Sequence, residues 1–448
     1  MNNAVLKQQN NMRSVFFISL VAAMGGFLFG FDTAVISGAE QTIQQLWQLS
    51  DFYHGLAVAI ALYGTVLGAL FGGWPSDRYG RKITLVFVAL LYLVSAIGSA
   101  LANDVITFMI FRFIGGLGVG ASSVAAPMYI SEISPARLRG RMVGLFQFNV
   151  VLGIVIAYVS NYFLKGTGDN DWRLMLGVEA VPALLFMILL YFIPESPRWL
   201  IVKRNDETGA RAVMEKVDPA NVDRSIKDIK TELEQAKESH ATVFFSKAYF
   251  TPIMLAVAFA FFNQMAGINA IIYYAPRIFE LTGLAKGSAL ISTIGIGVFN
   301  LIFTLIGMTL IDRSGRRILM LIGSFGLIVS LGLVARAFLT NQFNGVPIFL
   351  FIYIAFFAMS QGAVIWVFIS EIFPNEVRAN GQSLGSFTHW ILNAFIANFF
   401  PFTVSKFGGG VIFAFFTFMM ILQLLFVWRV MPETKGKSLE EIGKGLKR

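Results

Sequence analysis

The sequence GGWPSDRYGRK at Gly72–Lys82 returns near the middle of the chain as GMTLIDRSGRR at Gly307–Arg317, 235 residues later. Two more motifs repeat in the same order, with SEISPARLRGR from Ser131 returning as SEIFPNEVRANG from Ser370, and PESPRWL from Pro194 returning as PETKG from Pro432. The offsets of these two pairs are 239 and 238 residues. Three motifs repeated at nearly one offset indicate that about half of the chain has been duplicated.

The composition is that of a membrane protein. Hydrophobic residues make up 56% of the chain, charged residues make up 14%, and the mean hydropathy is +0.69. Soluble domains carry about 25% charged residues. The chain has no cysteine, which excludes disulfides and thiolate metal sites. The net charge of +9 does not predict nucleic-acid binding, because the basic residues lie in short loops between apolar runs.

Twelve apolar segments are long enough to cross a bilayer, for which a helix needs about 20 residues. They lie near 15–36, 54–74, 84–102, 105–131, 142–164, 172–193, 249–281, 287–311, 317–340, 347–373, 381–405 and 409–431. The sequence therefore predicts an all-α membrane protein with two six-helix bundles, at 1–200 and 249–448. Leu233 and Ala236 lie at helical spacing in the polar stretch 201–248, which predicts short amphipathic helices there. A disordered tether is the alternative for this stretch.

Lysine and arginine are concentrated in the loops that follow the second, fourth and eighth segments, and in the tail. Loops on the other side carry single charges, such as Lys165, Lys286 and Lys406. Because cytoplasmic loops carry the excess of basic residues, both termini and the middle stretch are predicted to be cytoplasmic.

Seven motifs together resemble the sugar porter family of the major facilitator superfamily. They are FGFDTAVISG (29–38), GGWPSDRYGRK (72–82), FRFIGGLGVG (111–120), PESPRWL (194–200), NQMAGINAIIYYAP (263–276), DRSGRR (312–317) and PETKG (432–436). The resemblance covers nearly the whole chain and is nearest to bacterial proton–sugar symporters. It implies the twelve-helix major facilitator fold, with sugar and protons as partners and with no cofactor.

Asp32 lies well inside the first apolar segment, where a carboxylate is costly and normally faces a cavity or a partner. Arg112, inside the fourth segment, is the expected partner. The resemblance implies that these two residues form the proton-coupling pair. The alternative is a permanently ionised structural pair in a passive carrier.

The second half carries the polar and aromatic residues expected of a sugar site. The duplication places Asn269 where the first half has Asp32, and an amide cannot titrate but can donate to and accept from sugar hydroxyls. Amides inside apolar helices are expensive if unpaired. The candidate substrate-binding residues, several of them implied by the resemblance, are Gln264, Asn269, Asn263, Asn300, Trp366, His389, Trp390 and Phe29. Structural bonding between helices is the alternative for each amide.

The chain departs from the family pattern at three positions. Ile154 replaces a familiar glutamine, Asn263 replaces the first residue of a glutamine pair, and His389 stands just before Trp390. Because these signals point to different sugars, the sequence does not name one. His389 is as compatible with packing as with substrate contact.

The repeated basic motifs predict a salt-bridge network at the cytoplasmic gate. Glu132 and Arg139, like Glu371 and Arg378, are seven residues apart, a spacing that places each pair at a helix end and its loop. Ion pairs at a closing interface bias a two-state equilibrium, although exposed pairs contribute little individually. The network is predicted to contain Arg78, Arg81, Glu132, Arg139, Glu195, Arg313, Arg316, Glu371 and Arg378.

The sequence predicts a transporter and no enzyme, because it has no nucleophile elbow, phosphate loop or metal-ligand spacing. The predicted function is proton-coupled uptake of a monosaccharide by a monomer in the inner (plasma) membrane. A passive sugar uniporter and a sugar sensor that does not transport are the alternatives.

Overall fold

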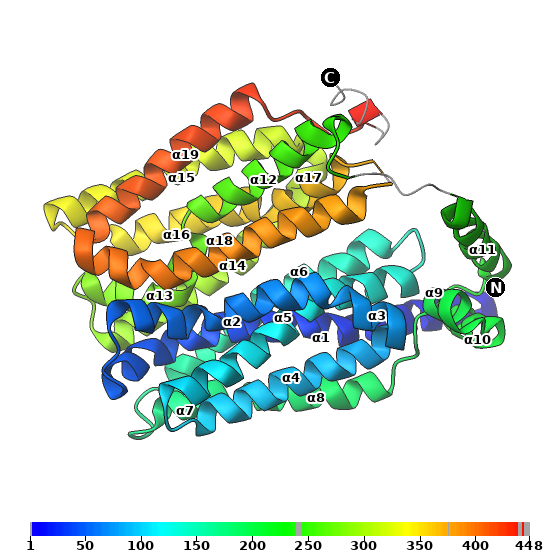
Figure 1. Ribbon diagram of the computed structural model, residues 1–448, viewed down its shortest axis with the longest axis horizontal. Helices are drawn as coiled ribbons and strands as arrows, with labels where there is room; N and C mark the ends of the chain where they lie inside the picture. The colour runs from blue at the N-terminus through cyan, green and yellow to red at the C-terminus, as the bar shows by residue number, and fades with distance from the viewer. Residues whose placement is uncertain (1, 239–243, 375, 438–440, 443–448) are drawn as a thin grey trace.

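The computed structural model describes residues 2–238, 244–374, 376–437 and 441–442. Within these residues the chain forms helices and contains no β-strand. Figure 1 shows the helices in two bundles that lie side by side, one from each half of the chain. The predicted all-α membrane fold with two bundles is confirmed.

Six spans form the first bundle, with the short helix α3 after the second span and the sixth span divided into α7 and α8. They are α1 (Asn2–Leu46), α2 (Asp51–Phe71), α3 (Gly73–Tyr79), α4 (Arg81–Leu101), α5 (Val105–Ile133), α6 (Arg139–Leu164), α7 (Asp171–Gly177) and α8 (Ala180–Tyr191).

The second bundle also contains six spans. They are built from α12 (Phe250–Met265), α13 (Ile268–Leu281), α14 (Lys286–Ser314), α15 (Arg316–Thr340), α16 (Val346–Phe357), α17 (Ala363–Glu371), α18 (Arg378–Phe407) and α19 (Gly409–Arg429).

In the described part of the chain, 11 helical stretches are apolar and long enough to cross a membrane. The twelfth predicted segment is α18, which has 30 residues and therefore spans about 45 Å at 1.5 Å per residue. It is long enough to cross, but buried amides at Asn393 and Asn398 make it less apolar than the others.

Three spans are broken within the bundles. The α7–α8 span is interrupted at Val178 and Glu179. The α12–α13 span turns at Gly267, whose φ of 81° favours glycine because other residues are strained there. A π-helical turn at Ala358–Gly362 separates α16 from α17. Discontinuous helices that build binding sites are a recurring feature of membrane transporters.

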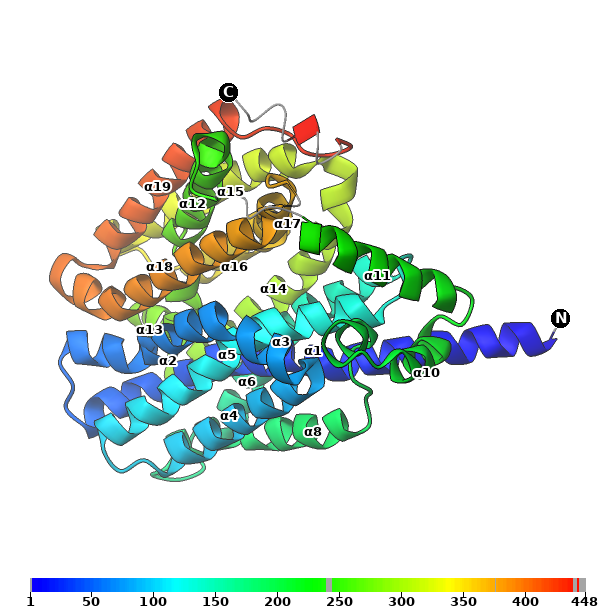
Figure 2. The same ribbon diagram turned by 45° about the vertical axis from the view of Figure 1, so that its right-hand side comes forward.

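The linker forms helices rather than a structureless tether. α9 (Pro197–Trp199) and the π-helical turn Leu200–Arg204 lead into α10 (Glu207–Val217) and α11 (Val222–Glu238). Their apolar faces bury Ile201, Ala210, Met214, Val222 and Ile226 in one small cluster. In Figure 2, α10 and α11 lie at the end of the molecule where α1 begins.

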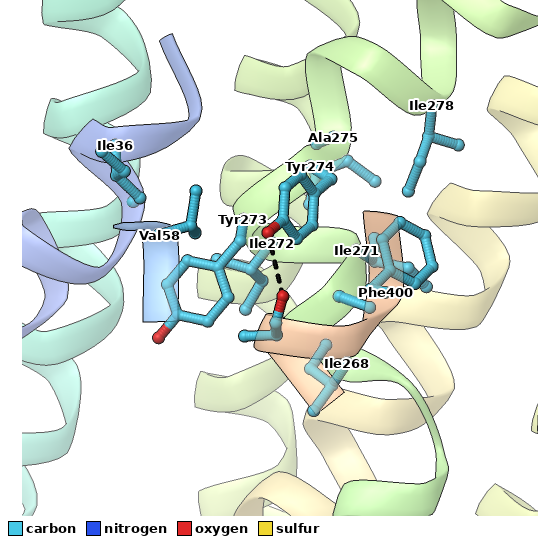
Figure 3. Close-up of a cluster of buried hydrophobic side chains, with 14 of the residues drawn as sticks. Ile36, Val58, Ile268, Ile271, Ile272, Tyr273, Tyr274, Ala275, Ile278 and Phe400 are labelled. Atoms are coloured by element: carbon cyan, nitrogen blue, oxygen red, sulfur yellow. Dashed lines mark hydrogen bonds between the residues drawn. The ribbon is translucent and has the colours of Figure 1, made fainter. Parts of the chain in front are cut away.

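The two bundles pack against each other through α1 and α13, α2 and α18, and α6 and α14. α2 approaches α18 closely at Gly55, where a Cβ would lie 1.8 Å from the carbonyl oxygen of Asn398. Figure 3 shows part of this interface, with Tyr273 and Tyr274 of α13 between Val58 of α2 and Phe400 of α18. The Tyr274 hydroxyl donates to the carbonyl oxygen of Ala397 at 2.9 Å.

Candidate functional site

Asp32 and Arg112 form a buried ion pair inside the first bundle. Both residues are 2% exposed, and Arg112 Nη1 donates to Oδ1 of Asp32. Arg112 Nη2 also donates to the backbone carbonyl of Asp32 at 3.3 Å. The pairing predicted from the sequence is therefore present. It makes an ionised carboxylate tolerable at this depth.

Glu179 lies beside this pair and was missed at the sequence level. It occupies the break between α7 and α8, is 1% exposed, and interacts with the side chain of Asp32. The signal was available, because Glu179 is a carboxylate inside the sixth apolar segment, as Asp32 is in the first. Two carboxylates beside one arginine leave one negative charge uncompensated if both are ionised, and one bound proton restores neutrality.

Four polar side chains of the second bundle form one hydrogen-bonded group. Gln264 is central: its Oε1 accepts from Nδ2 of Asn269 at 2.8 Å, and its Nε2 donates to Oδ1 of Asn263 at 3.0 Å. Gln264 Nε2 also lies 3.0 Å from Nδ1 of His389. The break at Gly267 makes this grouping possible, because it brings Asn269 of α13 back toward the end of α12.

Aromatic rings adjoin this polar group. The rings of Trp366 on α17 and Trp390 on α18 each lie 5.0 Å from the ring of His389. Phe29 of α1 lies 5.4 Å from Trp390, so a ring of the first bundle also reaches the group. Trp366 remains 36% exposed, which leaves a flat apolar face accessible. Amides beside aromatic faces suit a pyranose, which has hydroxyl edges and C–H faces.

Asn300 is separate from this hydrogen-bonded group. It is 8% exposed on α14, and its Oδ1 accepts from the hydroxyl of Thr304 one turn later at 3.3 Å. Ile154 of α6 is 5% exposed and belongs to the apolar core between the bundles. The structure thus brings together seven of the eight predicted substrate-binding residues and gives Asn300 a partner on its own helix.

A protein-family model described as "Sugar (and other) transporter" matches residues 18–446. The chain belongs to the sugar transporter family. The D-xylose-proton symporter of Escherichia coli strain K12 is 35% identical over 98% of this chain and 96% of its own length. The arabinose-proton symporter of Bacillus subtilis strain 168 is 37% identical over 99% of this chain and 97% of its own.

Solved structures of the xylose transporter XylE from E. coli match the whole fold. The inward open conformation has a TM-score of 0.86 at 35% identity, covering 97% of this chain and 100% of that one. The complex of the proton:xylose symporter XylE with 6-bromo-6-deoxy-D-glucose has a TM-score of 0.81 at 36% identity, covering 98% and 100%. The chain is therefore a multi-pass membrane transporter of the major facilitator superfamily and not an enzyme.

In this transporter the DRYGRK motif forms an ion-pair network within the first half. Arg81 is 7% exposed and donates from Nε and Nη2 to both oxygens of Glu132, each at 2.9 Å. The Glu195 carboxylate accepts from the backbone N–H groups of Arg81, Lys82 and Ser196. Burial raises the pKa of Glu195, although these backbone donors act in the opposite direction.

The second half repeats this network residue by residue. Arg316 donates to both oxygens of Glu371, at 3.1 and 2.7 Å, and Glu433 accepts from the backbone N–H groups of Arg316 and Arg317, each at 3.0 Å. Glu433 was missed at the sequence level, although PETKG aligns it with Glu195 of PESPRWL. Burial acts to raise the pKa of Glu433, but four backbone N–H groups outweigh it, and the net pKa is lowered.

The predicted pairs seven residues apart do not form. Arg139 donates to the backbone carbonyl of Ser131, and Arg378 donates to the backbone carbonyl of Phe373, because Arg81 and Arg316 already occupy the two glutamates. Arg78 instead lies over the rings of Trp74 and Tyr79. The side chain of Arg313 is exposed, and its carbonyl accepts from Lys435. Every ion pair between described residues at this end lies within one half or the linker.

Proposed function

We propose that this chain carries a monosaccharide, a hexose or pentose, into the cell together with protons, by alternating access between its two halves. The proposal rests on one observation: the two halves contribute different kinds of buried residues. A buried carboxylate with one arginine partner lies in the first half, and a cluster of amides beside aromatic rings lies in the second. The names of the relatives, D-xylose-proton symporter and arabinose-proton symporter, are consistent with this reading.

In this proposal Asp32 takes up the proton and Arg112 stabilises the deprotonated form. Once Asp32 is neutral, Arg112 is free to pair with Glu179, so the state in which Asp32 carries the proton has a compensated arrangement. Gln264, Asn269, Asn263 and His389 bind the sugar hydroxyls, while Trp366, Trp390 and Phe29 contact its apolar face. Asn300 would join them only if its bond to Thr304 is exchanged for one to the sugar.

We further propose that both termini and the linker are cytoplasmic and that the protein acts as a monomer in the inner membrane. The arginines of both repeated motifs lie at the linker end, which supports this orientation by the excess of basic residues there. The two networks would then contact each other across the halves when the cytoplasmic side closes. The boundaries at residues 200 and 249 stay a prediction of where one half ends and the other begins.

Uptake of labelled xylose, arabinose and glucose into proteoliposomes tests the proposal. A proton symporter accumulates its sugar above the outside concentration when the pH outside is lower, and a protonophore abolishes the accumulation. A passive uniporter equilibrates the sugar whether or not a protonophore is present. A sensor binds sugar in a calorimeter but moves none.

A further inference from the structure

A second buried charged cluster lies at the end of the bundle opposite the two arginine networks. Glu40 belongs to the last turns of α1 and His54 to the first turn of α2, and both are fully buried. His54 Nε2 lies 2.7 Å from Oε2 of Glu40. The contact lacks the direction of a hydrogen bond, and Nδ1 of His54 has no hydrogen-bond partner. A buried imidazole without a bonded partner needs an explanation.

Arg277 of α13 reaches Glu40 from the other half. Its Nη2 lies 2.9 Å from Oε2 of Glu40, and its Nε donates to Oε1 at 3.1 Å. Nη2 also donates to Oε1 of Gln44 at 2.5 Å. Of the ion pairs that the structure gives between described residues, Glu40–Arg277 is the one that joins the two halves.

The remaining charged groups on the neighbouring elements have partners of their own or lie at a distance. On α2, Asp51 accepts from Gln44 at 3.2 Å. On α5, Arg112 is held by Asp32, and Glu132 is at the opposite end. On α13, the ring of Tyr274 lies 5.9 Å from the ring of His54, with its hydroxyl bonded to Ala397.

Other helices near this end carry charged residues that have contacts of their own. Lys406, on the last turn of α18, lies over the rings of Phe402 and Phe407. Lys165 pairs with Asp171 at 3.3 Å. Lys165, Glu280 and Lys286 line a separate polar hollow with Gln41 and Gln45 on α1. Asp77 and Arg78 of α3 lie at the far end of α2. Glu40 therefore has two cations within reach, Arg277 and protonated His54.

Opening this end requires α13 to move away from α1 and α2, because they belong to different halves. Arg277 then leaves with α13, while Glu40 and His54 stay together in the first half. Glu40 loses its only permanent cation, and an unpaired carboxylate in a protein interior is costly. A proton on His54 supplies the missing charge, and histidine is the side chain that ordinarily gains or loses a proton between pH 5 and 8.

We propose that Glu40 and His54 form a second proton-binding site, which takes a proton from outside when Arg277 withdraws and releases it when Arg277 returns. The proposal rests on the proposed function for the orientation that makes this the outer end. His54 and Arg277 thus exchange as the counter-ion of Glu40. Acid outside favours the outward-open state, independently of Asp32. For one proton, the ratio of open to closed molecules rises by up to about tenfold per pH unit.

Spin labels at the outer end measure this equilibrium directly. The chain has no cysteine, so Leu46→Cys and Leu281→Cys, both on exposed positions in different halves, accept labels without background. Distances between the labels are measured in nanodiscs between pH 5 and 8, without sugar or gradient. An Asp32→Asn background removes any contribution of the first proton site. The expected result is a long-distance population that grows several-fold as the pH falls.

Three variants decide the outcome. His54→Gln and Glu40→Gln are each expected to flatten the pH dependence, and Arg277→Gln is expected to enlarge the long-distance population at every pH. Each variant is checked for sugar binding to show that it is folded. One folded variant, either His54→Gln or Glu40→Gln, is sufficient for the test. Full pH dependence in either folded variant, or a long-distance population that shrinks on acidification, overturns the proposal. Because the assay contains no transport step, its failure is distinct from failure of proton–sugar symport.

Discussion

Arg112 donates hydrogen bonds to both the carboxylate and the backbone carbonyl of Asp32, with Nη2 3.3 Å from the carbonyl oxygen. The guanidinium therefore fixes the position of α1 against α5 as well as the charge of the carboxylate. Lysine is a point charge and cannot make both bonds in this geometry. Replacing Arg112 with lysine therefore separates the effect of its positive charge from its effect on the position of α1.

Arg112→Lys is expected to reduce proton-driven sugar accumulation by about tenfold or more, since it keeps the charge and loses one of two charge-assisted hydrogen bonds. Arg112→Ala is expected to abolish accumulation. Initial rates of uptake into proteoliposomes under an imposed pH gradient measure both effects. Accumulation by Arg112→Lys at the wild-type rate would show that charge alone is sufficient.

Gln264→Ala is expected to weaken sugar binding by about tenfold or more, because it removes buried hydrogen bonds worth about 1–3 kcal/mol. Isothermal titration calorimetry on the purified protein measures the change. Gln423→Ala is the matched control, since Gln423 is equally buried but bonds Gln361 and Ser324 within the second half. Unchanged affinity in folded Gln264→Ala, or an equal loss in the control, would remove Gln264 from the sugar site.

Glu433→Gln is expected to lower the thermal unfolding midpoint at pH 7, with the difference shrinking as the pH falls below 4.5. The sign follows from the lowered pKa of Glu433 relative to its ordinary value of 4.5. The ionised form is favoured in the folded state, so its stabilisation is present above the unfolded value and is lost as the pH falls through the folded one.

Asp312→Asn is the control for this measurement, because Asp312 also lies near Arg316, at 3.4 Å, but is 80% exposed in its side chain. An exposed pair of this kind contributes at most about 1 kcal/mol. A midpoint difference for Glu433→Gln that persists undiminished at pH 4 would contradict the account of its backbone bonds.

The architecture could be predicted well because it depends on features that are local in the sequence. Apolar length predicts a span, and basic loops predict a side of the membrane. Arg81, Glu132 and their copies Arg316 and Glu371 were placed in one network by the repeat, although their partners were assigned wrongly. Spacing along the chain indicated Arg139 as the partner of Glu132, whereas packing brings Arg81 from another helix.

It was harder to predict which buried charged side chains from different helices lie together. Asp32 and Arg112 were paired because few ionic residues lie deep in the first half, yet Glu179 shares that property and was missed. No role was predicted for His54 at the start of the second apolar segment, whereas it is fully buried in α2 beside Glu40. Arg277, the other cation beside Glu40, is 223 residues from His54 and lies in the other half, and one sequence contains no signal that brings the two together.

Proton coupling through Asp32 is the central claim, and sugar-driven proton movement measures it most directly. Asp32→Asn keeps the shape of the side chain but cannot cycle between charged and neutral forms. Sugar is added to proteoliposomes loaded with a pH indicator, for the wild type and the variant, and counterflow exchange serves as the control for a working site. The account predicts sugar-dependent acidification of the lumen with the wild type and none with Asp32→Asn, while the variant still exchanges sugar. Equal acidification by both proteins, or none by a wild type that transports sugar, would contradict it.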